Sequence, residues 1–414
     1  LSLAARRQLT PVVQVFSDLG FSRNSGTFPA IGLSSTMATL PASAPTNPFQ
    51  QAIRVATPTT SIDGHYSSTG VTYRAVGGVI SALPADWKLE ADASWIRYHL
   101  DWQAPPSLAA TAAPAYAAGL LNPLRDPQLY PLDLSPYFLP PTEGPQSVYQ
   151  RDYTLRFSGP VGQLSGGAPR LSGLLERLEQ VYGAVDYMSA GTFYYMPQTA
   201  QLVQSAYLEA RIPLFSEVNR RRGLEELELQ LAGRVDDYEV DGSNTFIPAG
   251  ATIVRATNRM RSTNPTIALR YKPVPSLMLR GSYGTGFVPP SPSQTAPNPP
   301  QTSAGNYFDP RRGNQILGTF TTYSGGRSDL RPEESTSWSA GLVYSPTFIP
   351  RFRVSLDWLQ LKKKDNITTL SGQVILNNED LFPERVTRGA NLPGDQPGWA
   401  GPVTGLDFSV INVA

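Results

Sequence analysis

The chain lacks cysteine altogether and has only two histidines among its 414 residues. The first absence excludes disulfide bonds, thiolate-ligated zinc and a cysteine nucleophile. A serine hydrolase would have to recruit His65 or His99 as its base, and no Gly-x-Ser-x-Gly turn marks a partner serine. We therefore predict that the chain is not an enzyme and has no catalytic residues, no bound cofactor and no metal site.

Charged residues and long apolar runs are also scarce. Asp, Glu, Lys and Arg make up 16% of the chain, where soluble proteins average about 25%. The formal net charge of +1 gives no electrostatic footprint for nucleic acid, so no nucleic-acid partner is predicted. No apolar stretch approaches the length that a membrane-spanning helix needs.

Apolar and polar side chains alternate, however, over many short segments. Leu89 and Trp95 fall on one face of an extended strand and Glu90 and Asp92 on the other, because successive side chains of a strand point to opposite faces. Residues 171–178 have helical spacing instead and are predicted as a short helix. The predicted strands are 12–22, 71–81, 87–100, 148–158, 178–188, 200–212, 224–238, 263–272, 276–287, 335–346, 350–361 and 403–412.

The connections between these segments are alternately long and short. The long ones are residues 23–70, 101–147, 239–262, 288–334 and 362–402. The tight ones are 82–86, 273–275 and 347–349, and three of middling length are 159–177, 189–199 and 213–223. Long external loops that alternate with short periplasmic turns are typical of an all-β transmembrane antiparallel β-barrel, which is the predicted fold class. A soluble β-sandwich binding module has the same strand period and stays open as an alternative.

Two segments carry information beyond this pattern. Residues 279–289 read Leu-Arg-Gly-Ser-Tyr-Gly-Thr-Gly-Phe-Val-Pro, and residues 328–334 read Ser-Asp-Leu-Arg-Pro-Glu-Glu. Together they resemble the barrel of TonB-dependent outer-membrane receptors. In that family a strand ending in Gly-Phe-Arg-Ala-Pro enters a long external loop, which returns through Asn-Pro-Asp-Leu-Lys-Pro-Glu. Val288 stands where Arg is common, and Arg331 stands in place of Lys. The matching residues are Gly284, Gly286, Phe287, Pro289, Asp329, Leu330, Pro332 and Glu333.

The resemblance implies a protein of the Gram-negative outer membrane that imports a scarce ligand, such as a siderophore, cobalamin or an oligosaccharide. The implied partners are outer-membrane lipid and lipopolysaccharide, the small-molecule ligand, and the TonB complex, which such receptors contact through an N-terminal plug. No plug is found in the sequence, and about twelve of the 22 strands of such transporters are present. We therefore expect residues 1–414 to be a partial barrel domain, a fragment that lacks the plug and the later strands.

The polar faces of the predicted strands supply candidates for the lining of the barrel lumen. Most of them are expected to form a solvated wall or ion pairs rather than a ligand site. Residues 288–300 contain six prolines, which excludes a central strand and predicts a polar surface loop. A passive porin, or a surface-exposed structural barrel without energy coupling, is the alternative function. The lumen-facing candidates are Arg74, Glu90, Asp92, Arg234, Arg280, Arg353 and Asp357.

Overall fold

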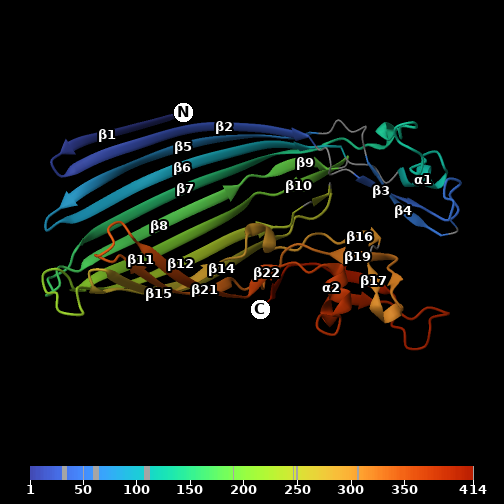
Figure 1. The fold of residues 1–414 in the computed structure, drawn as a ribbon. Coiled ribbons are helices and arrows are strands. Elements are labelled where there is room, and N and C mark those ends of the chain that lie inside the picture. The colour runs from blue at the N-terminus through green and yellow to red at the C-terminus, as the bar shows by residue number, and fades with distance from the viewer. Residues whose placement is uncertain are drawn as a thin grey trace.

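The computed structural model describes residues 1–29, 35–49, 51–58, 65–106, 112–189, 191–245, 247–248, 250–304 and 307–413. In these ranges fifteen strands belong to one antiparallel sheet, and twelve of them lie side by side in chain order. Figure 1 shows these long strands as a curved wall with the loop elements gathered at one end. The twelve are β1 (Ser2–Thr10), β2 (Val13–Pro29), β5 (His65–Leu83), β6 (Trp87–Ala104), β7 (Thr142–Pro160), β8 (Arg170–Tyr182), β11 (Thr199–Phe215), β12 (Glu226–Ser243), β14 (Arg255–Val274), β15 (Leu277–Val288), β20 (Glu333–Tyr344) and β21 (Val354–Lys364).

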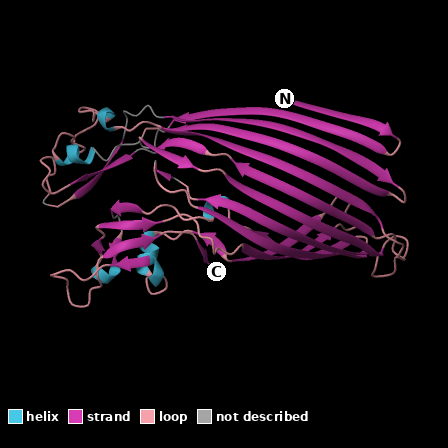
Figure 2. Ribbon diagram, turned by 180° about the vertical axis from the view of Figure 1, so that it is seen from behind, coloured by secondary structure: helices cyan, strands magenta, loops and turns pink. Residues whose placement is uncertain are grey.

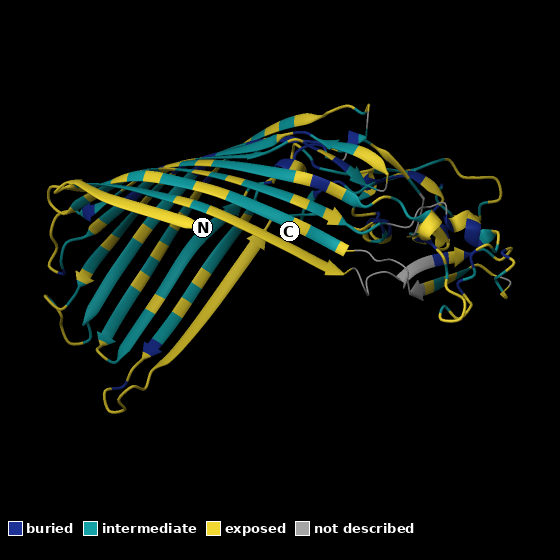
Figure 3. Cartoon of the chain, turned by 90° about the horizontal axis from the view of Figure 1, so that it is seen from above, coloured by how far each residue is buried: buried dark blue, intermediate teal, exposed yellow. Residues whose placement is uncertain are grey.

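The predicted antiparallel all-β architecture is confirmed, and each strand of the wall pairs with its neighbours in sequence. The pairing of β12 with β14 continues without interruption from Glu226 opposite Lys272 to Ser243 opposite Arg255. β1 and β21 are the two edges of the sheet, and among the described residues no pairing joins them. The view from above in Figure 3 shows the sheet curved around its inner side.

Long and short connections do lie at opposite ends of the wall, as the sequence predicts. The short end carries residues 11–12, 84–86, 161–169, 216–225, 275–276 and 345–353, and the other end carries 30–64, 105–141, 183–198, 244–254 and 289–332. The three connections of middling length therefore also obey the alternation. Figure 2 shows that the helices lie at the long-loop end.

The first two long loops fold together into one lobe. Its elements are β3 (Ser35–Leu40), β4 (Ile53–Pro58), α1 (Ala112–Ala117) and η1 (Ser135–Tyr137). β3 and β4 form a hairpin, and a small core that includes Leu40, Tyr116 and Leu134 joins the hairpin to α1. A second hairpin, β9 (Val185–Ser189) with β10 (Thr192–Met196), extends the wall, and the short β13 (Ile247–Pro248) pairs with β10.

The last two long segments form a second lobe, here called the cap. Its two halves are separated in sequence by the β20–β21 hairpin. β19 pairs in parallel with β24, and Leu317, Phe320, Ile375, Leu376, Val403 and Leu406 form a shared core. The elements of this region are η2 (Pro292–Gln294), β16 (Gln301–Ala304), β17 (Phe308–Asp309), η3 (Pro310–Arg312), β18 (Gln315–Ile316), β19 (Thr319–Tyr323), β22 (Asn366–Thr368), α2 (Gly372–Asn377), η4 (Pro383–Arg385), β23 (Val386–Arg388), β24 (Val403–Asp407) and β25 (Ile411–Val413).

Four details of the sequence prediction were wrong. The first strand of the wall, β1, was missed. The predicted helix at residues 171–178 lies inside β8, and the predicted strand 178–188 is divided between β8 and β9. Residues 403–412 do not form a strand of the wall, because β24 and β25 pair with cap strands.

The two faces of the wall differ in chemistry. Large apolar side chains on one face are open to the surroundings: Leu175 is 52% exposed, Ile267 49% and Trp358 54%. Four of the polar side chains that the wall buries, Thr154, Ser205, Asp236 and Ser262, lie on the other face. Side chains crowd on the inside of a curved sheet, so the polar face is the concave one.

This arrangement is the reverse of that in a soluble sandwich. Trp95 is 39% exposed, and Leu89, Leu229 and Leu279 are half-buried rather than sealed in a dry centre. A water-facing surface rarely carries so broad an apolar band, whereas a lipid-facing barrel wall requires one. Among the described residues no helix is long and apolar enough to cross a membrane.

Candidate ligand-binding face

Six of the seven side chains predicted to face the lumen lie on the concave face of the wall. The strand registers place Arg74, Glu90, Asp92, Arg234, Arg280 and Asp357 on this one face. Arg353 is the exception, because β21 begins only at Val354 and Arg353 therefore lies in the preceding turn. The sequence prediction began that strand four residues too early.

Arg156 is the centre of the first polar group on the concave face. Its guanidinium pairs with Glu90 at 3.4 Å and also with Asp92. The Thr154 hydroxyl donates to the same Asp92 carboxylate at 2.6 Å. Sequence reasoning missed Arg156 as a site residue, although it lies on a predicted strand where alternation alone would have assigned its face.

Arg234 is the centre of a second, tighter group. Its guanidinium donates at 2.8 Å to Asp236, to Glu176 and to the hydroxyl of Ser205, and Ser205 in turn donates to Asp236. The Asp236 side chain is only 5% exposed. The three hydrogen bonds that Arg234 donates compensate for the water that the buried charges of this group have lost. Glu176 was missed because its segment has helical spacing in the sequence.

The remaining pair, Arg280 with Asp357, bonds at 2.6 Å across β15, β20 and β21. Both side chains are about half exposed, so water screens the pair and it contributes little to stability. The charged groups of the concave face thus largely satisfy one another. They form a hydrated wall, and the chemistry of a ligand site must be sought elsewhere on this face.

Such a site is formed where the proline-rich segment after β15 folds back over the concave face. η2 packs against β11 and β12, and Thr295, Ala296 and Pro290 are fully buried. Residues 288–300 therefore do form a loop and not a central strand, as predicted, but the loop is partly buried rather than wholly at the surface. Prolines can form this segment because it bonds mainly through a few amides, such as Asn298 N–H to the Ser324 carbonyl.

A glycine on β12 makes this close approach possible. A Cβ on Gly242 would lie 1.6 Å from Thr295 Oγ1 and 2.2 Å from the Pro292 carbonyl oxygen. The segment is held on its other side by the Gly326 N–H, which donates to the Ala296 carbonyl at 2.7 Å. The Asn298 side chain accepts from the Thr245 N–H at 2.8 Å. These contacts fix η2 against the wall.

Between η2 and the wall lies a cavity of about 250 Å³. Tyr182, Val185, Met196 and Pro292 contribute apolar surface to its lining. Hydroxyl and amide groups come from Gln146, Thr199, Ser243, Thr245, Ser291 and Ser293. None of the described residues that line it is charged. The cavity is therefore suited to an uncharged ring or chain that carries hydrogen-bonding groups.

The residues of the two sequence signatures direct the chain into and out of the cap. Gly284, Gly286 and Phe287 end β15, Pro289 follows it, and the Phe287 ring lies 5.4 Å from that of Tyr238. At the return, Asp329 accepts from Arg327, and Leu330 is buried. Pro332 precedes β20, and Glu333, its first residue, pairs with Lys363 and accepts from the Ile367 N–H. Their positions indicate a structural role.

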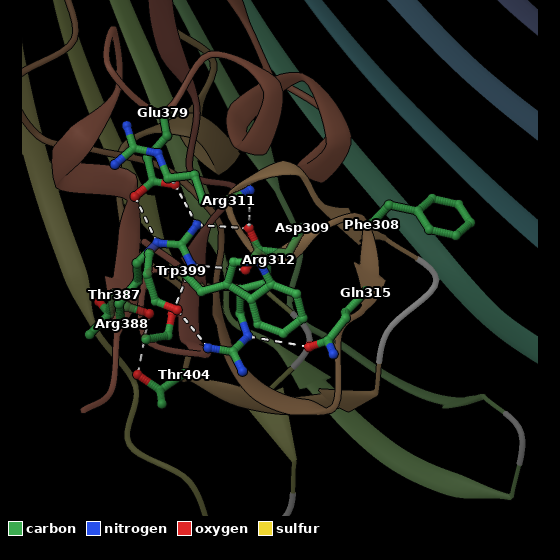
Figure 4. A network of polar contacts seen from close by, with 12 residues as sticks. Phe308, Asp309, Arg311, Arg312, Gln315, Glu379, Thr387, Arg388, Trp399 and Thr404 are labelled. Carbon is green, nitrogen blue, oxygen red and sulfur yellow. Dashed lines mark hydrogen bonds and ion pairs between the residues drawn. The ribbon is translucent and has the colours of Figure 1, made fainter. Parts of the chain in front are cut away.

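Buried ion pairs hold the two halves of the cap together (Figure 4). Arg388 donates to Asp309 at 2.8 and 3.0 Å and to Glu379 at 2.8 and 2.6 Å. Arg312 pairs with Asp395, donates to the Ala400 carbonyl and lies 5.2 Å from the centre of the Trp399 ring. Since the carboxylates and arginines come from both loops, the cap is one cross-linked unit.

The Arg312–Asp395 pair predicts an acid limit for the cap. The hydrogen bonds from Arg312 hold the pKa of the Asp395 carboxyl below its ordinary value of 3.8. A carboxyl with a lowered pKa in the folded state stabilises the fold fully above its unfolded pKa and loses that contribution as the pH falls through the folded value. We expect Trp399 fluorescence, read as the difference from Trp399→Phe, to stay constant from pH 8 to about pH 5 and to change below about pH 4. A transition centred near neutral pH would contradict this account.

In the ranges that the structure describes, no cluster of three or more acidic or histidine side chains could hold a metal ion. The acidic run at the end of β12, from Asp236 to Asp241, is spread over both faces of the strand.

A family model described as "TonB dependent receptor-like, beta-barrel" matches residues 18–411. Comparison with curated protein sequences finds no match.

Three solved structures illustrate the similarity of fold. The siderophore receptor PirA from Acinetobacter baumannii is 14% identical, with a TM-score of 0.55, over 99% of this chain and 48% of its own. The ferripyoverdine receptor from Pseudomonas aeruginosa is 13% identical, with a TM-score of 0.53, over 91% and 42%. The ferric-catecholate import receptor Fiu from E. coli K12 is 11% identical, with a TM-score of 0.51, over 90% and 52%. The chain thus spans about half the length of the structures it matches.

Proposed function

The chain belongs to the TonB dependent receptor-like β-barrel family, and on this basis we propose that it forms barrel wall and external loops of an active importer. The family consists of outer-membrane receptors of Gram-negative bacteria, which are transporters rather than enzymes. The observation that carries the proposal is the reversed polarity of the wall, with exposed apolar side chains on its convex face and paired charges on its concave face.

In this proposal the concave face lines a water-filled lumen. Arg74, Glu90, Asp92, Arg234, Arg280 and Asp357 are part of the lumen wall, and Arg353 is not. The convex face contacts outer-membrane lipid and lipopolysaccharide. Energy for import comes from the TonB complex, which acts through a plug domain outside the residues of this chain. Residues 1–414 then constitute part of a barrel domain, and the short-turn end faces the periplasm.

The ligand is captured at the long-loop end. The similar structures are named as receptors of siderophores or as a ferric-catecholate import receptor, which supports a ferric siderophore as the ligand class. The uncharged cavity beneath η2 would hold a neutral part of such a ligand, for example a ring with hydroxyl or amide substituents, rather than its charged iron centre. Cobalamin and oligosaccharides are alternatives that the same lining would accept.

Energy dependence separates this importer from a passive porin. Iron-starved cells that produce the whole protein are given iron-55 complexes of a catecholate, a hydroxamate and a mixed siderophore. We expect one of them to accumulate above the level of cells without the protein. A protonophore should abolish this accumulation while binding at the cell surface persists, because only import depends on the inner-membrane gradient. Uptake that is unaffected by the protonophore would favour the porin.

A further inference from the structure

The turn between β20 and β21 has an unusual surface for a short connection. Over residues 345–353 the side chain of Phe348 is 75% exposed, that of Ile349 44% and that of Phe352 46%. Exposed aromatic and branched side chains at a loop tip are costly in water, so this turn requires an apolar environment.

The same turn carries two arginines and no acidic residue. Arg351 and Arg353 are exposed, and among the described residues neither side chain has an ion-pair or hydrogen-bond partner. The turn at residues 216–225 is also rich in arginine. Its Arg220 pairs with Glu225 at 3.8 Å, its Arg221 and Arg222 are exposed, and its exposed apolar side chain is the smaller Val218. Exposed phenyl rings next to the guanidinium groups thus distinguish the β20–β21 turn.

The apolar surface of the turn is continuous with the convex face of the wall. Tyr344, at the end of β20, is 36% exposed, and on β21 Val354 and Leu356 are 42% and 69% exposed. Residues 354 and 356 lie on the same face of β21 as Trp358. The exposed apolar band of the convex face therefore reaches both ends of the turn, and the two arginines lie beside it.

We propose that the β20–β21 turn is an interfacial anchor for the phospholipids of the periplasmic leaflet. Phe348, Ile349 and Phe352 insert at the boundary between acyl chains and headgroups, and Arg351 and Arg353 bind the lipid phosphates. Aromatic rings favour this depth of a bilayer, and guanidinium groups form paired hydrogen bonds to phosphate oxygens while their stems remain in the apolar layer. The only charged side chains of the turn are these two arginines, so its positive charge favours an anionic lipid.

A single fluorescent label tests how deeply the turn lies in the bilayer. Because the chain has no cysteine, an introduced cysteine is labelled at that position alone. The full chain with Thr347→Cys is labelled with an environment-sensitive NBD fluorophore and placed in vesicles of phosphatidylethanolamine and phosphatidylglycerol. We expect blue-shifted emission that lipids with a doxyl group near the headgroup quench. The matched control, Glu217→Cys in the 216–225 turn, should report water and should not be quenched.

Two double variants then assign the roles of the side chains. Phe348→Ser with Phe352→Ser should remove the blue shift at residue 347. Arg351→Gln with Arg353→Gln should remove its dependence on the fraction of phosphatidylglycerol. If the label at residue 347 is as exposed to water as that at residue 217, the lipid anchor is refuted. The exposed side chains of the turn would then be a contact surface for a periplasmic protein. If the arginine variant responds to phosphatidylglycerol like the parent, recognition of phosphate is refuted.

Discussion

Replacement of Arg388 by methionine is expected to unfold the cap while the wall stays intact. The Arg388 side chain is 14% exposed, and its partners Asp309 and Glu379 are 3% and 9% exposed. The substitution leaves two carboxylates with little water and without their shared cation. Removal of one partner from a buried ion pair typically costs about 3–5 kcal/mol, which is comparable to what a small lobe with six core residues can supply. Hydrogen exchange of peptides from β17 and α2 measures the loss.

Two companion variants show whether charge is the cause. Arg388→Met combined with Asp309→Asn and Glu379→Gln removes all three charges and should restore most of the protection. Arg280→Met breaks an ion pair that is half exposed and screened by water, so it should have a much smaller effect on stability. If Arg388→Met leaves exchange in β17 and α2 unchanged, the two loops are not held together by this network.

Gly242→Ala is expected to release the proline-rich segment from the wall and to weaken ligand binding. A Cβ at this position would overlap Thr295 Oγ1 and the Pro292 carbonyl oxygen. The backbone oxygen cannot rotate away, so η2 must move. The cavity then loses the groups that Ser291, Pro292 and Ser293 supply. Two lost hydrogen bonds together are worth about 1.5 kcal/mol, which corresponds to roughly a tenfold loss of affinity. Binding of the imported iron complex to intact cells provides the measurement.

Gly233 offers a matched control on the same strand. A Cβ at Gly233 would have no neighbour within 4 Å, so Gly233→Ala should leave binding unchanged and should cost nothing in stability. An equal loss of binding in both variants would mean that the effect comes from a change in strand β12 and not from the displacement of η2. Unchanged binding in Gly242→Ala would exclude the cavity as the ligand site.

The wall could be predicted from the sequence because lipid on one side and water on the other impose a strict alternation. Leu229 and Gln230 reveal their faces without knowledge of any partner strand. β1 was missed because Ala4 and Ala5 are both apolar and Arg6 and Arg7 are both charged, so its alternation is broken. β8 resembles a helix because Leu171, Leu174, Leu175 and Leu178 recur with helical spacing, and only the pairing with β7 and β11 shows that these residues belong to two faces of a strand.

The cap and the cavity could not be predicted in this way. Val403 to Asp407 alternates weakly and resembles a wall strand. Its partners, however, are β23 in the same segment and β19 in the loop that precedes β20, which is remote in sequence. The packing of η2 against β12 is possible only because Gly242 has no side chain. The sequence shows that a glycine lies in the strand, but not which segment packs against it. The polar groups behave likewise, since alternation places Arg234 on the concave face but does not identify Glu176 as its partner.

The opposed polarity of the two faces can be tested directly on β12. The chain has no cysteine, so single cysteines at positions 227 to 231 can carry a nitroxide spin label in lipid vesicles. We expect labels at residues 227, 229 and 231 to collide more with oxygen, which concentrates in lipid. Labels at residues 228 and 230 should collide more with a water-soluble nickel complex, so that the ratio alternates with a period of two. A ratio that favours nickel at all five positions, or a pattern with the opposite phase, would contradict a lipid-facing convex surface and the importer with it.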